Sequence, residues 1–258
     1  APPRALPPVV VVGEGDEPPV VGRVQAGGQH LVVHARAPTR RTGRDAVERG
    51  AGEARERAQG RGIDRQIIRA YGYLASHYRP GDRIFLFGYS RGAFAVRSLA
   101  GVIDRIGLLR RDAATERHVK LAYRHYQQGP TSDAARAFAR LHCHAQAPIQ
   151  MVGVWDTVKA LGLRLPLLWM LTEGRHAFHN HHLGDSIRHG FQALALHENR
   201  SVFEPVLWES SPNWAGNVEQ MWFRGAHGDI GGQLGAFDEA RPLANIPLVW
   251  MLERAEAC

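Results

Sequence analysis

A short apolar run that leads into a glycine-flanked serine constrains the fold of this chain more than any other feature. Residues 84–87 are Ile-Phe-Leu-Phe, and Gly-Tyr-Ser-Arg-Gly follows at once at residues 88–92. A continuous apolar run of this length predicts a strand buried on both faces of a parallel sheet. Residues 93–106 predict a helix that Gly107 ends. Strand, sharp turn and helix in this order are one unit of a wound α/β sheet.

Similar patterns extend on both sides of this unit. Apolar residues at helical spacing predict a helix over residues 63–78, which a Pro-Gly-Asp turn ends. Pro247 is expected in the first turn of the last helix, where proline is tolerated. The sequence thus predicts an α/β fold with a mostly parallel wound sheet flanked by helices. The further helices are expected at residues 112–127, 186–197 and 245–256, and the further strands at residues 151–155 and 221–223.

The first quarter of the chain differs from the rest. It is rich in Pro, Gly and Arg; the valines of residues 9–12 predict a buried strand, and residues 31–33 a short second one. Residues 35–62 contain almost no large apolar side chain, so they cannot bury enough apolar surface to offset the entropy of ordering. We therefore expect a divergent or partly disordered segment over residues 1–61 and one α/β domain over residues 62–258.

The net charge of +7 raises the question of a nucleic-acid partner. Lysine occurs only at Lys120 and Lys159, so nearly all of the positive charge is arginine, and it is spread along the chain. Acidic residues interrupt the one dense arginine region, which lies between residues 36 and 61. We therefore expect no nucleic-acid partner. A weak attraction to the anionic headgroups of a membrane surface is the milder consequence of the same charge.

Cysteine usage and hydropathy exclude further classes of protein. Cys143 and Cys258 form no C-x-x-C pair, so we predict neither a disulfide framework nor a cysteine-based zinc site. No run of eighteen apolar residues occurs, and no apolar stretch precedes the first prolines. The sequence therefore predicts no transmembrane helix and no general export signal. A protein of this kind is expected in the cytoplasm as made.

The serine turn carries the chemistry. Gly88-Tyr89-Ser90-Arg91-Gly92 fits G-x-S-x-G between a predicted strand and a predicted helix, the context that a nucleophile elbow requires. Gly88 and Gly92 allow the close approach of the backbone at this turn. The backbone N–H of Arg91, at the helix start, can stabilise a developing oxyanion. The alternative is a glycine-rich turn in which Ser90 only caps the helix.

A serine nucleophile needs a base, and the base needs an acid that orients it. In α/β-hydrolases these follow the serine in the order acid, histidine, each after a strand. Asp156 and His227 satisfy both conditions, and Asp229 and Asp185 are reserve candidates for the acid. Asp156 could instead cap a turn, and His227 could be a structural histidine. The mechanism that these residues predict needs neither metal nor cofactor.

Two other segments lie between Asp156 and His227. His176, His179, His181 and His182 cluster in a polar stretch without matching carboxylates, so we predict no metal site there. Residues 161–171 are apolar and are interpreted either as ordinary core or as a lipid-facing lid over the site.

Four ordered blocks resemble an α/β-hydrolase domain family that includes bacterial type VI secretion phospholipase effectors. The resemblance implies an α/β-hydrolase-like fold with a Ser90–Asp156–His227 triad. It also implies phospholipase activity on membrane lipids or related esters, and export by a specialised secretion system. The blocks are residues 80–93 with 97–101, residues 152–158, residues 192–200 with Phe203, Pro205 and Trp208, and residues 224–232.

This chain also departs from the family pattern. The Asp-Gly-Thr signature after the first strand, expected to help form the oxyanion hole, is absent, and Gly-Glu-Gly-Asp at residues 13–16 is a weak substitute. No resemblance is found before Gly62, and so abrupt a change is typical of a shifted reading frame, a wrongly chosen start or a diverged N-terminus. Gln192 and His197 replace an expected histidine and aspartate. Loss of one oxyanion donor costs about 10²–10³ in turnover. The alternative function is therefore a catalytically inactive or truncated domain that serves as a binding module.

Overall fold

One mixed sheet organises the part of the chain that the computed structural model describes, namely residues 5–12, 20–25, 29–30, 61–158, 182–209, 214–234 and 237–258. Its strand order is β3-β2-β1-β4-β5-β6-β7. Strands β1 and β4 to β7 are parallel, whereas at one edge β2 pairs antiparallel with β1, and β3 pairs antiparallel with β2. The strands are β1 (Ala5–Val12), β2 (Val20–Gln25), β3 (Gln29–His30), β4 (Ile84–Tyr89), β5 (Ile149–Trp155), β6 (Ile187–Ala195) and β7 (Asn217–Phe223).

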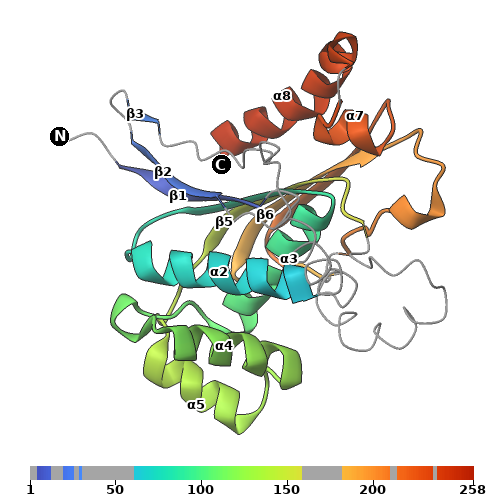
Figure 1. Cartoon of the computed structure of the whole chain (residues 1–258). Helices are drawn as coiled ribbons and strands as arrows, with labels where there is room; N and C mark the ends of the chain where they lie inside the picture. The colour runs from blue at the N-terminus through green and yellow to red at the C-terminus, as the bar shows by residue number, and fades with distance from the viewer. Residues whose placement is uncertain are drawn as a thin grey trace, which may run out of the picture.

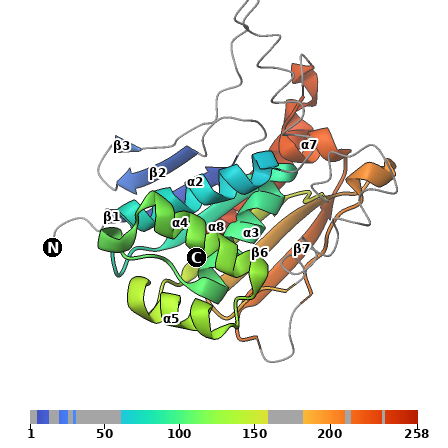
Figure 2. The ribbon, with the colours of Figure 1, turned by 60° about the horizontal axis from the view of Figure 1, so that its bottom comes forward.

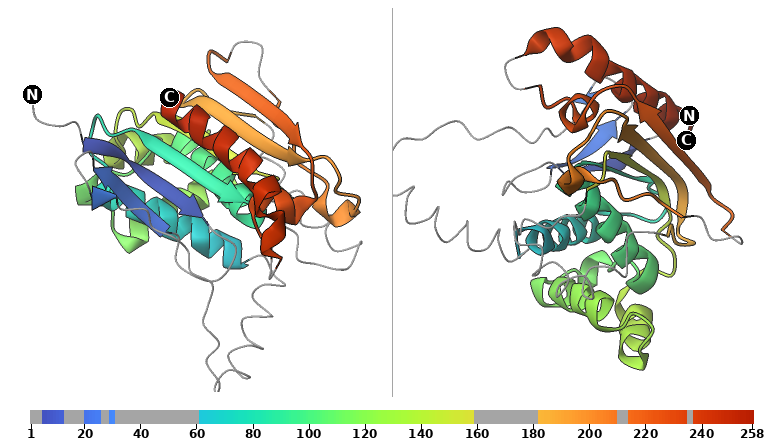
Figure 3. Two further views of the ribbon diagram at one scale, coloured as in Figure 1. Left: turned by 90° about the horizontal axis from the view of Figure 1, so that it is seen from above. Right: turned by 90° about the vertical axis from the view of Figure 1, so that its right-hand side faces the viewer.

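Helices cover both faces of this sheet (Figure 1). Helices α2 and α3 lie on one face, α4 and α5 form a further layer outside them, and α7 and α8 lie on the opposite face (Figures 2 and 3). The predicted mostly parallel sheet flanked by helices is thus confirmed. The helices are α2 (Arg61–His77), α3 (Arg91–Ile106), α4 (Glu116–Gln128), α5 (Asp133–His142), α7 (His227–Gly231) and α8 (Arg241–Ala257), with 3-10 turns η1 (Arg111–Ala113), η2 (Ser201–Phe203) and η3 (Asp238–Ala240).

Each face of the sheet has its own apolar layer. On one face, Leu74 of α2 and Leu99 of α3 are fully buried against the sheet. Leu86 of β4 is also fully buried, as expected for a strand covered on both faces. Under α8, Trp250 and Met251 pack against the opposite sides of the same strands. The central strands are therefore held between two cores, and their carboxyl ends remain as the place for functional side chains.

The structure corrects the predicted helix at residues 186–197, because these residues form β6 between β5 and β7. Most side chains of β6 are buried, including Phe191 and Leu194. A short apolar segment buried on both faces has no strand periodicity, so spacing alone cannot separate it from a buried helix. The spacing of the apolar residues was therefore misread as helical in β6, the strand next to β5.

Two helices begin elsewhere than predicted, and a third helix was missed. Helix α4 begins only at Glu116, because the Thr115 side chain accepts a hydrogen bond from His118 N and caps it. Helix α8 begins at Arg241, so Pro247 lies inside the helix rather than in its first turn. Helix α5 was not predicted, although Ser132 caps it in the same way as Thr115 caps α4. Capping residues were the signal that could have found both starts.

The first strand lies where the valine run predicts it. Its residues Val9 to Val12 pair in parallel with residues 85–88 of β4. The sheet thus includes strands from before residue 62, although the division of the chain after residue 61 stays a prediction. The second predicted strand, at residues 31–33, and most of the segment predicted to be poorly ordered lie outside the described residues.

Two glycines allow a test of how tightly the sheet and its helices pack. A Cβ atom on Gly153, in β5, would lie 2.7 Å from Met251 Sδ and 2.8 Å from Phe87 Cδ1. We therefore expect Gly153→Ala to lower the free energy of unfolding by about 1–3 kcal/mol. In Gly72→Ala, the control in α2, the new methyl group would be in ordinary contact with Val119, and helix propensity predicts a gain of up to about 1 kcal/mol. Urea unfolding of both variants measures the difference, and equal midpoints would contradict it.

Candidate active site

Ser90 lies at the sharp turn between β4 and α3. Its backbone angles are φ 55° and ψ −120°, a left-handed conformation that a side chain rarely adopts. Its N–H donates to the carbonyl of Trp155 at 3.0 Å, which ties the turn to the neighbouring strand. A Cβ atom on Gly88 would clash with the backbone carbonyl of Gly92. Gly88 is therefore needed for this turn, and the serine hydroxyl is presented at the carboxyl edge of the sheet.

His227 is the residue that connects the other two predicted members of the site. It is the first residue of α7, directly after β7 and its glycine turn. Its Nε2 lies 2.8 Å from Ser90 Oγ and its Nδ1 lies 2.6 Å from Asp156 Oδ2. All three residues are buried, with exposed fractions of 1% for Ser90, 1% for Asp156 and 5% for His227. The structure therefore brings serine, imidazole and carboxylate into one chain of hydrogen bonds.

Asp156 is held in place by its own backbone and by β6. It follows β5 with φ 44°, and its second carboxylate oxygen, Oδ1, accepts a hydrogen bond from Ala195 N at 3.0 Å. An ionised carboxylate can only accept hydrogen bonds, so His227 Nδ1 carries the proton and donates it to Asp156. His227 Nε2 is then the acceptor for the hydroxyl of Ser90. This tautomer is the one that lets an imidazole take a proton from serine.

The remaining candidates lie elsewhere around the site. Asp229 accepts a hydrogen bond from Ala226 N at 2.8 Å and so caps the short helix α7. Asp185 is exposed in the turn before β6, at the end of the sheet away from Asp156. Of the three carboxylates considered, it is that of Asp156 which meets His227. Arg91 is the first residue of α3, so its N–H lies at the positive end of the helix dipole.

Aromatic rings enclose the imidazole, a feature that the sequence did not reveal. The ring of Phe203, in η2, stacks on His227 with centroids 4.5 Å apart and an interplanar angle of 23°. The ring of Tyr89 also packs against His227, with centroids 4.7 Å apart, and its hydroxyl donates to His227 O at 3.0 Å. Only tertiary packing brings these segments together. The position of Tyr89 beside the serine was the one local signal for its part in the site.

The two departures from the family pattern have polar partners in this structure. Gln192 is fully buried in β6, where it accepts from Arg97 and donates to the carbonyl of Val206. His197 Nδ1 accepts a hydrogen bond from Gly225 N at 3.2 Å, just before the histidine turn. The side chains of Gln192 and His197 are therefore both hydrogen-bonded in this structure.

Among the described residues, no group of three or more His, Cys, Asp or Glu side chains could hold a metal ion. Of the four clustered histidines only His182 is described; it is exposed, and its Nδ1 lies 3.2 Å from the carbonyl of Glu209. His176, His179, His181 and the apolar residues 161–171 lie outside the described residues, so the predicted lid stays untested. None of the helices in the described ranges is long and apolar enough to cross a membrane.

Comparison with known proteins adds a family to this geometry. The family model described as "T6SS, Phospholipase effector Tle1-like, catalytic domain" matches residues 25–254. This match corrects the expectation that resemblance begins at Gly62, because it extends well upstream of that residue. Residues 25–61 contain none of the four sequence blocks on which the resemblance was based.

Individual relatives are more distant. An uncharacterised protein of Saccharomyces cerevisiae is 30% identical over 161 residues, which cover 58% of this chain and 22% of that protein. An uncharacterised protein from Pseudomonas aeruginosa, known as a crystal structure, is 19% identical with a TM-score of 0.27, covering 69% of this chain and 24% of that one. A Tle1 effector bound to the VgrG spike is 19% identical with a TM-score of 0.25, covering 72% and 30%. The chain thus spans under a third of the length of each of these proteins.

Proposed function

Since the chain belongs to the family of Tle1-like catalytic domains of type VI secretion phospholipase effectors, we propose that it is a serine hydrolase that cleaves a carboxylic ester of a phospholipid. Ser90 is the nucleophile, His227 the general base and Asp156 the acid that orients it. One observation carries the proposal. It is the unbroken chain of hydrogen bonds from Ser90 Oγ through His227 to Asp156, with lengths of 2.8 and 2.6 Å.

The first half of the reaction acylates the serine. His227 Nε2 takes the proton of Ser90 as Oγ attacks the ester carbonyl, and the carbonyl oxygen becomes an oxyanion. The Arg91 N–H at the start of α3 is the expected donor to this oxyanion. Asp156 stabilises the imidazolium through Nδ1–H. His227 then returns its proton to the leaving alcohol, and the acyl group remains on Ser90.

The second half releases the acyl group. Water enters, His227 accepts one of its protons, and the resulting hydroxide attacks the acyl carbonyl. When the tetrahedral intermediate collapses, Ser90 regains its proton from His227 and a fatty acid leaves. Ester and water are thus converted to alcohol and acid. The burial of all three side chains supports these reaction steps, since a desolvated site strengthens each electrostatic interaction.

The choice of a phospholipid rests on the family description, which names a phospholipase effector. A lipid in a bilayer has to be reached at the membrane surface, to which the net positive charge of the chain would be weakly attracted. Export by a type VI secretion system is proposed on the same basis. No nucleic acid or cofactor is part of the proposal.

Active-site labelling by a fluorescent fluorophosphonate is the experiment that tests the proposal. It asks whether Ser90 is activated without requiring the substrate to be known. We expect the folded protein to be labelled, and we expect no label on Ser90→Ala or His227→Ala. Ser98→Ala is the matched control, because Ser98 is a buried serine like Ser90 but lies two turns further along α3. Its labelling should equal that of the wild type.

The substrate class is then read from released fatty acid. Vesicles of phosphatidylethanolamine and phosphatidylglycerol are compared with a short p-nitrophenyl ester, and hydrolysis of the vesicles above the ester supports a phospholipase. Hydrolysis of the short ester alone would restrict the proposal to small esters. A folded wild type that takes no label would instead favour the inactive binding module that the missing Asp-Gly-Thr signature suggests.

A further inference from the structure

An ion pair lies directly behind the histidine turn. Glu198, just after β6, has a side chain that is only 5% exposed, and its Oε2 accepts a hydrogen bond from the backbone N–H of His227 at 3.2 Å. The same carboxylate accepts from Arg200 three times, from the backbone N at 2.9 Å, from Nε at 2.8 Å and from Nη2 at 2.6 Å. Glu198 thus links the backbone of His227 to the guanidinium of Arg200.

The guanidinium continues this link to the face of the imidazole. Arg200 Cζ lies 4.2 Å from the centroid of the Phe203 ring, and Phe203 in turn stacks on His227 at 4.5 Å. A cation over an aromatic face is attracted to it, so Arg200 holds the ring against the imidazole. Glu198 and Phe203 therefore contact His227 from its backbone and from its ring, and Arg200 joins the two contacts.

We propose that Glu198, Arg200 and Phe203 are positioning residues that keep the His227 ring aligned between Ser90 and Asp156. The proposal rests on the function proposed above, in which His227 Nε2 and Nδ1 have different tasks. A ring that rotates about its bond to Cβ loses both hydrogen bonds at once. The rings of Phe203 and Tyr89 both pack against the imidazole and limit this rotation, and the Glu198 contact fixes the backbone from which the ring projects.

The ion pair also places two opposite charges beside the imidazole. Hydrogen bonds from Arg200 lower the pKa of Glu198 to about 2, so Glu198 is ionised at every pH well above that value. The other titratable groups around His227 are Asp156 after β5, Tyr89 at the end of β4 and Asp229 in α7. The negative charge of Glu198 favours an imidazolium and the positive charge of Arg200 disfavours it. Removal of either one leaves the other uncompensated.

Two charge-removing variants therefore test the proposal. The protonation of the imidazole is followed by NMR in protein with ¹³C-labelled histidine, with His227→Ala for assignment. In Glu198→Gln the remaining Arg200 should move the titration midpoint of His227 to lower pH, and in Arg200→Gln the remaining Glu198 should move it to higher pH, each by about half a pH unit. Opposite shifts show that both charges act on the imidazole, and the labelling rate of the Phe203 variants tests whether the ring is also held in place.

The aromatic contact is tested by the rate of fluorophosphonate labelling. We expect Phe203→Leu to slow labelling about tenfold, because the ring face loses its planar neighbour, and Phe203→Tyr to restore it.

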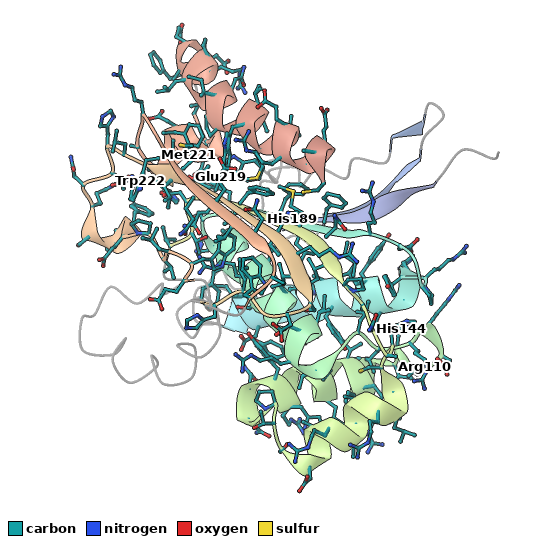
Figure 4. The ribbon with its side chains drawn as sticks, turned by 180° about the vertical axis from the view of Figure 1, so that it is seen from behind. Arg110, His144, His189, Glu219, Met221 and Trp222 are labelled. Atoms are coloured by element: carbon teal, nitrogen blue, oxygen red, sulfur yellow. The ribbon has the colours of Figure 1, made fainter. Side chains whose placement is uncertain are left out.

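The control for the two charge variants is Glu219→Gln. Glu219, which Figure 4 labels, lies in β7 and pairs with Arg254 of α8 at 3.0 Å. Arg254 Cζ lies 4.8 Å from the centroid of the Trp250 ring, so a similar arrangement recurs between β7 and α8.

The outcomes separate the two proposals. Opposite shifts in the two charge variants, with no shift in Glu219→Gln, support the positioning role. Shifts of the same sign, or a Phe203→Leu variant that labels at the wild-type rate, overturn it. A wild type that takes no label would defeat the hydrolase proposal alone, since the titration is read from the ring itself and still tests whether the three residues act on His227.

Discussion

Replacement of Asp156 by asparagine is expected to slow fluorophosphonate labelling and ester hydrolysis by about 10⁴-fold. In the wild type the Asp156 carboxylate accepts a hydrogen bond from His227 Nδ1 at 2.6 Å. An asparagine amide can present a donor at that place, which favours the tautomer with its proton on Nε2. His227 would then offer Ser90 a proton instead of a lone pair. Labelling rates, measured on variants with an unchanged circular dichroism spectrum, check the prediction.

Asp229→Asn is the control for this prediction. The Asp229 carboxylate accepts a hydrogen bond from Ala226 N and serves as a helix cap. The ring nitrogens of His227 contact Ser90 and Asp156 instead. An asparagine keeps the oxygen that accepts this hydrogen bond, so the labelling rate should change by less than about threefold. A greater loss in Asp229→Asn than in Asp156→Asn would assign the acid to the reserve candidate and would contradict the proposed triad.

Gly88→Ala is expected to lower the labelling rate by at least about 10²-fold, because it displaces the serine turn. The added Cβ would clash with the carbonyl oxygen of Gly92, which is backbone and cannot rotate away. Either β4 or the start of α3 must move, and Ser90 lies between them. The distance of 2.8 Å between Ser90 Oγ and His227 Nε2 cannot survive such a movement unchanged.

Two measurements separate this displacement from a general loss of folding. Gly72→Ala adds the same methyl group in α2, away from the serine turn, and should label at the wild-type rate. Urea unfolding should show Gly88→Ala to be folded under the labelling conditions. A Gly88→Ala protein that is folded and labels at full rate would show that the turn tolerates a side chain there, against the packing described above.

The sequence allowed the site to be located because its members follow a rule of local context. Ser90, Asp156 and His227 each come directly after a predicted strand, and parallel strands end at the same edge of a sheet. The order along the chain then limits which residue can take each part. Their mutual distances could not be obtained in this way, because they depend on the packing of β4, β5 and β7.

The features that the sequence did not reveal depend on long-range contacts or on ambiguous patterns. Phe203 and Tyr89 meet at His227 only after folding, since the first lies in η2 and the second in β4. Strand β6 was predicted as a helix because Phe191 and Leu194 have a spacing that suits either structure when both faces are buried. The ion pair of Glu198 and Arg200 is local in sequence, but its hydrogen bond to His227 is not.

The left-handed backbone at Ser90 and Asp156 has a thermodynamic consequence for the whole domain. These are the two non-glycine residues with positive φ in the described part of the chain, at 55° and 44°. A conformation of this kind costs of order 1–3 kcal/mol at each position, against a net stability of about 5–15 kcal/mol for a typical domain. Glycine at either position would relieve that cost. A domain with glycine at these two positions would therefore fold more firmly, and the strain retained at Ser90 and Asp156 supports the catalytic roles proposed for them.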